Sequence, residues 1–469
     1  MAETRKFRNP VIPGFAPDPS VIFVDGVFYL ATSSFHVFPG IPIYASTNLQ
    51  EWKHIGNAIN RKGQLSLHDA ETSVMPLDTG SIMVATAGLF APTIRHHNGT
   101  FYIICTNATR KDDTFSLDNF YISTTDIWSG TWSDPIHFDF SGIDPSLFFD
   151  DDGRVYVQGC WMIDRLQQPS CTIKQFEIDI QFGRPLSETR EIWGGFAKYD
   201  TEGPHIYKHS GYYYLLVAEG GTFEHHLLSI GRSKSIWGPY ESCESNPVMT
   251  ADGKPEEYIQ NIGHGPVGDY GRAISAPADV DWVYIRDPDF DKYVFDGEGD
   301  NRIFKLCASQ SSISSNTGTV TFVGRRQRSL NASASVTLDI SGAGSKSVSA
   351  GLALYKDALR HVSLAYDFES FQLIFDVTTT SEEKEQRFTI PFESGVATLR
   401  LRVETSPREY TFFYRGDENG LREVAGKVQV ANVVAREMTG PIFGLFAQAR
   451  DVNDVGKEVL FERFLVEDS

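Results

Sequence analysis

The sequence predicts an all-β chain in which several small sheets are arranged radially and a second all-β domain follows them. Three observations predict this fold class: a hairpin motif repeats along the first part of the chain, Phe, Tyr and Gly are abundant, and apolar residues show no long helical periodicity. The motif recurs at intervals of roughly 50 to 75 residues, the scale of a propeller blade of about four strands rather than of a solenoid repeat. The first part of the chain is therefore predicted to be a β-propeller.

Each copy of the motif is a strand that starts at a proline and runs into a second, glycine-led strand. The copies occupy residues 18–30, 91–103, 144–157 and 203–215. Asn98-Gly99 and the acidic stretch 150–153 lie between paired strands, and these residue types favour hairpin turns.

The amino-acid composition of the sequence changes near residue 310. Residues 309–319 are rich in Ser, Asn, Gly and Thr, which indicates a linker or a domain seam. New alternating strands follow at 333–338, 350–355, 362–367, 371–377, 397–403, 409–414 and 442–448. We therefore predict two domains, a propeller over 1–310 and a two-sheet β-sandwich over 319–469.

Composition limits the partners of the chain. The net charge is -19 and the sequence has no basic cluster, which argues against nucleic acid and anionic surfaces and favours neutral ligands. Nothing resembles a membrane span. The five cysteines are odd in number and lack close pairing, so reduced thiols are expected. The first residues contain no apolar secretory core, so the chain as given is expected to stay in the cytoplasm, and to be extracellular if it has been trimmed.

Three acidic residues stand at the heads of motif copies: Asp18, Asp144 and Glu202. Enzymes that cleave glycosidic bonds usually do so with carboxyl groups, which the fold can bring together from separate sheets. The alternative is that each acid caps a turn, since Asp before Pro is common at turn starts. Their corresponding positions in separate copies favour the catalytic interpretation.

Several short sequence motifs together resemble those of glycoside hydrolase family 43, in its β-xylosidase and α-L-arabinofuranosidase branch. They lie at 9–20, 33–43, 91–95, 142–148, 202–205 and 218–222, and the segment from Thr321 to Gln327 resembles the opening of the β-sandwich appended to that branch. The resemblance implies a five-bladed propeller followed by a concanavalin-like sandwich.

The resemblance also implies roles for the acids. Asp18 would be the general base, Glu202 the general acid, and Asp144 the residue that adjusts the pKa of the acid and orients it. An inverting glycosidase needs one ionised and one protonated carboxyl. The implied reaction is release of xylose from the non-reducing end of β-1,4-xylo-oligosaccharides, with α-L-arabinofuranosidase activity on an arabinosyl substrate as the alternative.

Further residues are candidates for the sugar site. Phe35, Phe38 and Phe90 are expected to form walls of the sugar pocket, although most aromatic residues are core. Arg95 and His225 could donate hydrogen bonds to sugar hydroxyls or be structural.

His264 matches a family histidine near the propeller axis that often contacts a bound calcium ion. A hydrogen-bonded core histidine is the alternative, because calcium prefers oxygen ligands. No cofactor is expected to be required, and a bound calcium would be structural or electrostatic.

The sequence departs from the family after His264. Residues 265–277 lack the family's acidic residue, tryptophan-containing strand and sugar-contacting arginine, and the resemblance resumes at 281–288. The fifth blade is therefore predicted to be incomplete, through a natural deletion or an erroneous gene model. The second functional alternative is a catalytically impaired relative that binds sugar weakly or not at all.

Overall fold

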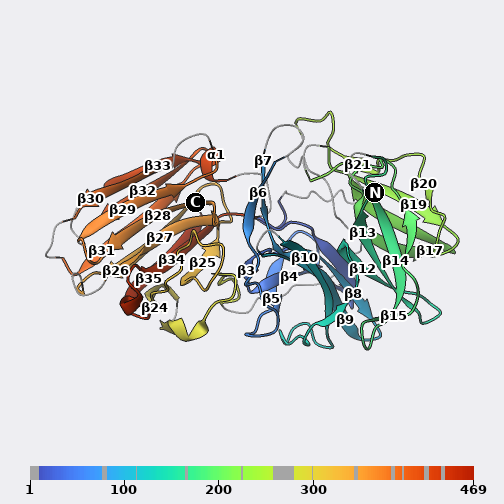
Figure 1. Ribbon diagram of the computed structural model, residues 1–469, viewed down its shortest axis with the longest axis horizontal. Coiled ribbons are helices and arrows are strands. Elements are labelled where there is room, and N and C mark those ends of the chain that lie inside the picture. Colours follow the sequence, from blue (N-terminus) through green and yellow to red (C-terminus); the bar gives the residue numbers. More distant parts are fainter. Residues whose placement is uncertain are drawn as a thin grey trace.

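The computed structural model describes residues 10–76, 82–111, 114–163, 167–222, 225–256, 279–297, 299–342, 347–381, 386–392, 396–416, 422–434 and 439–468. Nearly all regular structure in these ranges is β-strand, which confirms the predicted fold class. The helical pieces are α1 (Val430–Val433) and the short 3-10 turns Phe290–Lys292, Gly299–Asn301 and Val452–Asp454. Figure 1 shows two lobes side by side, one of blue to green sheets and one of orange to red sheets. No helix in the described ranges is long and apolar enough to span a membrane.

The first lobe contains four antiparallel sheets, each formed by consecutive strands. The first comprises β1 (Ser20–Val24), β2 (Val27–Ala31), β4 (Gly40–Ser46) and β5 (Lys53–Ile59). The second comprises β8 (Gly88–His97), β9 (Thr100–Lys111), β10 (Thr114–Thr124) and β11 (Ile136–Phe138). The third comprises β12 (Ile143–Phe149), β13 (Val155–Met162), β14 (Cys171–Asp179), β15 (Arg184–Pro185) and β16 (Arg190–Trp193). The fourth comprises β17 (Glu202–His209), β18 (Tyr212–Glu219), β19 (Leu227–Ser233), β20 (Glu241–Ser242) and β21 (Met249–Thr250).

Tight turns set the register of the first hairpin in each sheet. A two-residue turn with both residues at positive φ matches the twist of the paired strands. Such turns join the first two strands of three sheets, at Asp25-Gly26, Asn98-Gly99 and Ser210-Gly211. In the third sheet Asp150 N–H donates to the Arg154 carbonyl at 2.9 Å, which closes the predicted turn over 150–153.

The predicted fifth blade falls largely on residues 257–278, which lie outside the described residues. The chain is described again from Asp279, and β22 (Tyr284–Ile285) pairs with β3 (Val37–Phe38) of the first blade region. The number of blades and the incompleteness of the fifth therefore stay predictions.

The second lobe is a sandwich of a six-stranded and a seven-stranded sheet. The six-stranded sheet comprises β25 (Phe322–Arg326), β34 (Ile442–Ala449), β27 (Val348–Asp357), β28 (Arg360–Asp367), β29 (Gln372–Thr378) and β30 (Gln386–Pro391). The seven-stranded sheet comprises β23 (Tyr293–Asp296), β24 (Ile303–Cys307), β35 (Glu458–Asp468), β26 (Ala332–Asp339), β31 (Thr398–Thr405), β32 (Glu409–Arg415) and β33 (Glu423–Gln429). A separate hairpin, β6 (Thr72–Pro76) and β7 (Ile82–Thr86), belongs to neither sandwich sheet.

The sandwich starts earlier in the chain than the predicted boundary. Strands β23 and β24 precede residue 310, yet β24 pairs along its length with the C-terminal strand β35. The serine-rich stretch after them is packed rather than an open linker, because Ser309 bridges to Gln448 and Ile313 is buried. Pairing with a strand more than 150 residues away is invisible to local sequence patterns.

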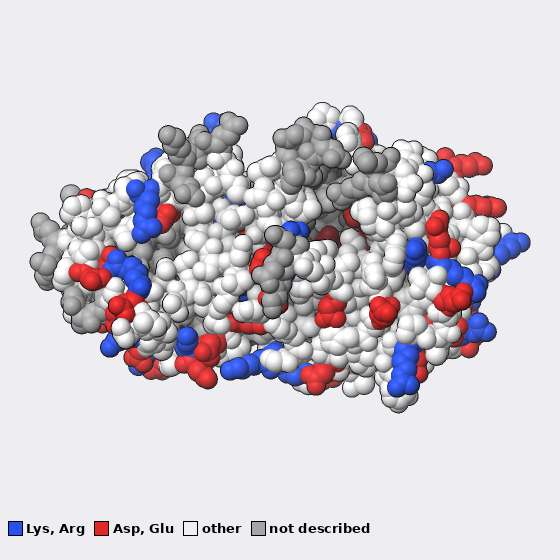
Figure 2. Space-filling view, in the orientation of Figure 1, with Lys and Arg blue, Asp and Glu red and all other residues white. Residues whose placement is uncertain are grey.

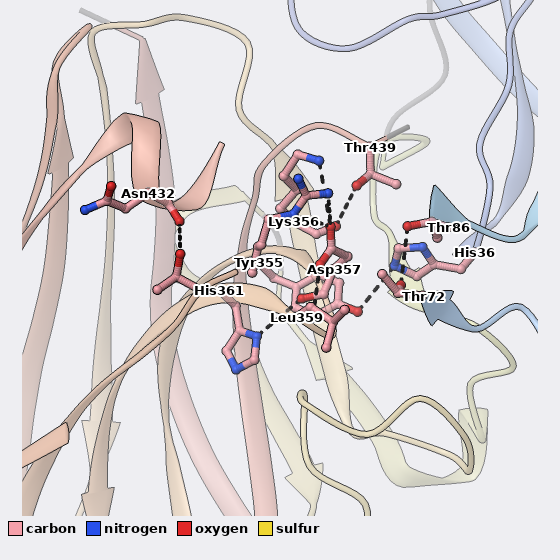
Figure 3. Close-up of polar contacts among 12 residues, drawn as sticks. His36, Thr72, Thr86, Tyr355, Lys356, Asp357, Leu359, His361, Asn432 and Thr439 are labelled. Carbon is pink, nitrogen blue, oxygen red and sulfur yellow. Dashed lines mark hydrogen bonds and ion pairs between the residues drawn. The ribbon is translucent and has the colours of Figure 1, made fainter. Parts of the chain in front are cut away.

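The two lobes meet across a buried polar seam. Every residue of β27 and β28 is buried, so both faces of these strands are covered. Figure 3 shows His36 of the propeller facing Tyr355 of β27, with 3.3 Å between Nε2 and the phenol oxygen. Burial, together with the charge of Arg286, lowers the pKa of His36 to about 3, so the imidazole is neutral there.

Charged side chains complete this seam on the sandwich side. Arg360 donates to Asp357 Oδ2 at 3.0 and 2.7 Å, Lys356 Nζ lies 3.7 Å from the same oxygen, and Thr439 donates to the Lys356 carbonyl at 3.0 Å (Figure 3). These charged groups all belong to the hairpin of β27 and β28, and the removal of one partner of a buried ion pair costs about 3 to 5 kcal/mol, so the cluster holds the turn of this hairpin. The seam adjoins Phe35, so it also supports the wall of the candidate site.

Candidate active site

The first strands of the four propeller sheets gather around a common axis. Strand β8 lies beside β1 and β12, and β12 lies beside β17. At or beside the start of each strand, the residue before the motif proline has a positive φ: 51° at Asp18, 37° at Ala91, 53° at Asp144 and 56° at Gly203.

Strand pairing shifts register at the same places, between Phe90 and Thr93, Ile143 and Ser146, and Glu202 and His205. A positive φ costs a non-glycine residue about 1 to 3 kcal/mol and persists only where its surroundings impose it. Bulges of this kind change the direction in which a side chain points. A positive φ at Asp18, at Asp144 and at Gly203 next to Glu202 thus marks the head of three separate sheets, with a register shift in the sheets of Asp144 and Glu202.

Asp18 is half-buried and is held by a neighbouring hydroxyl. Ser33 Oγ donates to Asp18 Oδ2 at 2.5 Å and accepts the backbone N–H of Ala91 at 2.6 Å. Because Ala91 belongs to the next sheet, the orientation of the Asp18 carboxylate is set by the contact between two blades.

Asp144 is buried, with 8% of its surface exposed. Burial and, second, the charge of Asp18 raise the pKa of Asp144 to about 7. The backbone N–H of Gly203 donates to Asp144 Oδ2 at 3.0 Å. This hydrogen bond lowers the pKa of Asp144, because it favours the ionised carboxylate.

The pKa of Glu202 is raised well above its ordinary range. Burial is the largest cause, and the charges of Asp144 and Asp200 follow. Both carboxyls therefore keep a proton at pH values where ordinary carboxyls have lost theirs. Because the Gly203 amide favours the ionised form of Asp144, we expect Asp144 to lose its proton first and Glu202 to keep its own. Figure 2 shows acidic side chains recessed in a hollow of the face that it draws.

Asp200 is a neighbouring acid that the sequence did not single out. It is buried, its N–H donates to Ser170 Oγ at 2.7 Å, and its carboxylate accepts from the same hydroxyl at 3.3 Å. Its charge adds to that of Asp144 in raising the pKa of Glu202. No sequence signal marked it, because its effect depends on burial beside Glu202.

Glu219 organises the loop that leads to Glu202. Its fully buried carboxylate accepts the N–H groups of Phe196 and Lys198 at 3.0 Å each and the hydroxyl of Thr201 at 3.1 Å. A side chain at Gly195 would lie 2.1 Å from Glu219 Oε1, so only glycine fits there. Glu219 belongs to the motif at 218–222 that resembles the family. Its hydrogen bonds could not be predicted from that motif, because they depend on the folded loop.

Three buried thiols lie near the acids. Burial, with the charges of Asp144 and Asp18, raises the pKa of Cys105, and Cys160 is hydrogen-bonded to Cys171, which is the main cause of its own raised pKa. All five cysteines of the chain are free thiols. The raised pKa values of Cys105 and Cys160 favour the neutral form of both thiols.

Two of the three predicted aromatic walls lie together near Asp18. The rings of Phe35 and Phe90 are 5.3 Å apart, and Phe35 also packs 6.4 Å from Phe15. Phe35 bridges to Leu89 of the next sheet, an approach that Gly88 permits because a side chain there would lie 2.2 Å from the Phe35 carbonyl oxygen. Phe38, the third residue, has different neighbours.

Phe38 instead pairs with Tyr284 and packs against Phe290, in a separate cleft of about 720 Å³ between the propeller and the sandwich. The chain turns between Phe35 and Phe38, so their side chains face different surroundings. Local sequence proximity could not reveal this.

Arg95 and His225 have other partners within the described residues. The guanidinium of Arg95 donates to the Leu147 carbonyl at 3.0 Å and lies 2.9 Å from His205 Nδ1, so it ties three sheets together. His225 is exposed and lies 3.0 Å from Asp252. These contacts favour the structural alternative for Arg95.

The adjacent His226 is buried, and its Nδ1 is hydrogen-bonded to the Gly221 carbonyl. Burial lowers its pKa, while this hydrogen bond and the charges of Asp18 and Asp200 raise it. His226 is therefore better placed than His225 to meet a ligand at the acids, and only the fold distinguishes the two.

His264 lies outside the described residues, so the calcium prediction stays untested. Within the described residues, no group of three or more His, Cys, Asp and Glu side chains has the arrangement of a metal site.

Comparisons with known proteins cover both lobes. The family model described as glycosyl hydrolases family 43 matches residues 7–270, and the model described as the beta xylosidase C-terminal concanavalin A-like domain matches residues 275–467. The second match, like the sheet topology, begins the sandwich domain before residue 310.

Curated relatives match the first lobe. Xylosidase/arabinosidase 43B of Humicola insolens is 38% identical over 263 residues, which is 56% of this chain and 46% of that protein. The non-reducing end alpha-L-arabinofuranosidase BoGH43B of Bacteroides ovatus is 38% identical over 265 residues, 55% of this chain and 45% of that protein. The matched region thus spans about half the length of these relatives.

Solved structures match the whole chain. The crystal structure of xylan beta-1,4-xylosidase from Bacillus halodurans C-125 superposes with a TM-score of 0.86 at 25% identity and covers 99% of this chain and 100% of that one.

Proposed function

The chain belongs to glycoside hydrolase family 43, and from this premise we propose that it is an inverting glycosidase that releases xylose from the non-reducing end of β-1,4-xylo-oligosaccharides. The observation that carries the proposal is the placement of Asp18, Asp144 and Glu202 at the same irregularity of separate blades, where their charges act on one another.

Asp18 serves as the general base. Its carboxylate deprotonates a water molecule that attacks the anomeric carbon from the face opposite the leaving group. The hydrogen bond from Ser33 holds the carboxylate in one orientation, so little reorganisation is needed when the water arrives.

Glu202 serves as the general acid. Its raised pKa keeps it protonated, so it can donate the proton to the glycosidic oxygen as the bond breaks. Asp144 maintains this state with its negative charge and, through the Gly203 amide, fixes the backbone next to the acid. In this scheme the product from a β-xyloside leaves as the α-anomer, because attack occurs once and from the opposite face.

The α-L-arabinofuranosidase alternative is supported by the printed name of the Bacteroides ovatus relative. The two sugars present similar hydroxyl geometry, so one pocket can serve both. The alternative of a catalytically impaired relative rests on the departure from the family sequence at 265–277. It predicts that the three acids occupy the same positions but that the protein does not turn over substrate.

Turnover of p-nitrophenyl β-xyloside and of p-nitrophenyl α-L-arabinofuranoside tests these alternatives, with the Asp18→Asn variant as control, because loss of the general base impairs hydrolysis whatever the leaving group. The ratio of the two kcat/KM values decides the sugar. Xylotriose, followed by NMR of the anomeric proton, tests the stereochemistry, and we expect α-xylose to appear first.

No turnover of either glycoside above that of the Asp18→Asn control would end the enzyme proposal. If β-xylose appeared first, the inverting mechanism would be contradicted, but the proposed hydrolase activity would not.

A further inference from the structure

A pocket of about 190 Å³ on the sandwich lies apart from the acids of the propeller. Its lining consists of four arginines and two aromatic residues: Arg400, Arg402, Arg415, Arg422, Phe413 and Tyr414. In β31 the buried Leu399 and Leu401 alternate with Arg400 and Arg402, so these arginines project from the outer face of the seven-stranded sheet. Arg415 and Arg422 come from β32 and from the residue before β33.

Two of these arginines stand directly opposite each other. Arg400 of β31 pairs with Arg415 of β32, and like charges at such a position destabilise a sheet. Neither arginine forms an ion pair within the described residues, and Arg415 Nε is buried there without a hydrogen-bond partner. Burial and the charges of Arg415, Arg402 and Arg463 lower the pKa of Arg400, which indicates a positive potential at this place.

The other two arginines are held in position. Glu404 accepts from Arg402 Nε at 3.0 Å and also from Arg422, whose guanidinium lies 3.9 Å from the centre of the Phe413 ring. No acidic side chain of the described residues lines the pocket itself. The pocket therefore has two oriented guanidinium groups beside two without an ion-pair partner.

The charge of the pocket contrasts with that of the chain. The net charge is -19, so the long-range field repels anions, and a concentrated basic pocket has to act at short range. A planar guanidinium fork matches a planar carboxylate in a bidentate manner. The volume is below the roughly 300 to 1,000 Å³ of a pocket for a drug-sized ligand, so one sugar ring or a smaller group fits better than a long chain.

We propose that this pocket binds the carboxylate of a uronic acid carried by an oligosaccharide. The guanidinium groups of Arg400 and Arg415 receive the carboxylate. Anion binding follows from the pocket alone, whereas the choice of a saccharide rests on the proposed function. The sandwich would then hold an acidic branch of a polysaccharide while the propeller acts on a neutral end.

Calorimetric titration of the full chain tests the proposal. The protein carries Glu202→Gln so that no ligand is consumed, and the probes are a glucuronic-acid-bearing xylo-oligosaccharide, neutral xylotriose and inorganic phosphate. The same titrations are made with Arg400→Gln and Arg415→Gln. The matched control is Arg387→Gln, because this exposed arginine belongs to β30 of the other sheet.

We expect the acidic oligosaccharide to bind, with affinity at least about tenfold lower in each pocket variant and unchanged in the Arg387→Gln control. Higher salt should weaken this binding, because charged groups carry it. Binding of the acidic oligosaccharide that exceeds the binding of neutral xylotriose and survives both pocket variants would overturn the assignment of the site. If inorganic phosphate bound with the same affinity as the acidic oligosaccharide, the proposal of a saccharide ligand would be refuted, and the pocket would be a simple anion site. Since the readout is binding, a failure here is distinct from a failure of the hydrolase proposal.

Discussion

Replacement of Asp144 by Asn is expected to stabilise the folded protein at alkaline pH while it lowers activity. Asn keeps the shape of Asp and can still accept the Gly203 N–H, which lies 3.0 Å from Oδ2. What the substitution removes is a buried negative charge beside Asp18 and Glu202.

The magnitude follows from the pKa of Asp144, which is raised from 3.8 to about 7, chiefly by burial. Because the folded-state pKa is the higher one, the folded protein retains a proton that the unfolded chain has already lost. The free energy of unfolding therefore falls as pH rises toward the folded pKa, by about 1.4 kcal/mol per pH unit. From about pH 5 to about pH 7 this amounts to roughly 2 to 3 kcal/mol, and above that range the loss is complete.

Urea unfolding of the wild type and of Asp144→Asn, measured at about pH 5 and about pH 8, tests this expectation. The stability gain of the variant should be larger at the higher pH by roughly 2 to 3 kcal/mol. Asp152→Asn in an exposed turn is the control, and its effect should not depend on pH. Equal gains of Asp144→Asn at both pH values would refute the reasoning, because no buried charge would then have been removed.

The remaining predictions concern the same carboxylates. Glu202→Gln should lower kcat/KM on xylobiose by about 10²- to 10⁴-fold and should affect p-nitrophenyl β-xyloside less, because that leaving group needs little protonation; an equal loss on both would contradict the role of Glu202 as acid. Asp18→Asn should impair both substrates alike, which kinetics on the two would check. Ser33→Ala should lower kcat more than it raises KM, since Ser33 orients Asp18 at 2.5 Å, and unchanged kcat would count against that role. Gly195→Ala should lower activity because its side chain would lie 2.1 Å from Glu219 Oε1, and a fully active variant would show that this loop does not position the acid.

Local sequence was sufficient to predict the strands, the hairpin turns and the acids. Alternation, glycine and proline act between residues that are neighbours in the chain, so the predicted turn at Asn98-Gly99 and most predicted sandwich strands agree with the structure. Strands β30, β33 and β35 were missed. The two exposed residues at the start of β33 show one reason, since a strand at a sheet edge has little apolar alternation to reveal it.

Tertiary packing alone decided which residues surround the acids. Ser33 reaches Asp18 from the segment that follows β2, the buried Asp200 acts on the half-buried Glu202, and Phe38 lines another cleft.

The basic pocket illustrates the same division. The sequence contains no cluster of basic residues, yet the pairing of β31 with β32 brings Arg400 and Arg415 opposite each other. Residue types and spacing thus determined what each segment could form and which chemistry was available. Pairing between distant strands determined which charges meet, because burial and proximity are properties of the folded chain and set the pKa of each group.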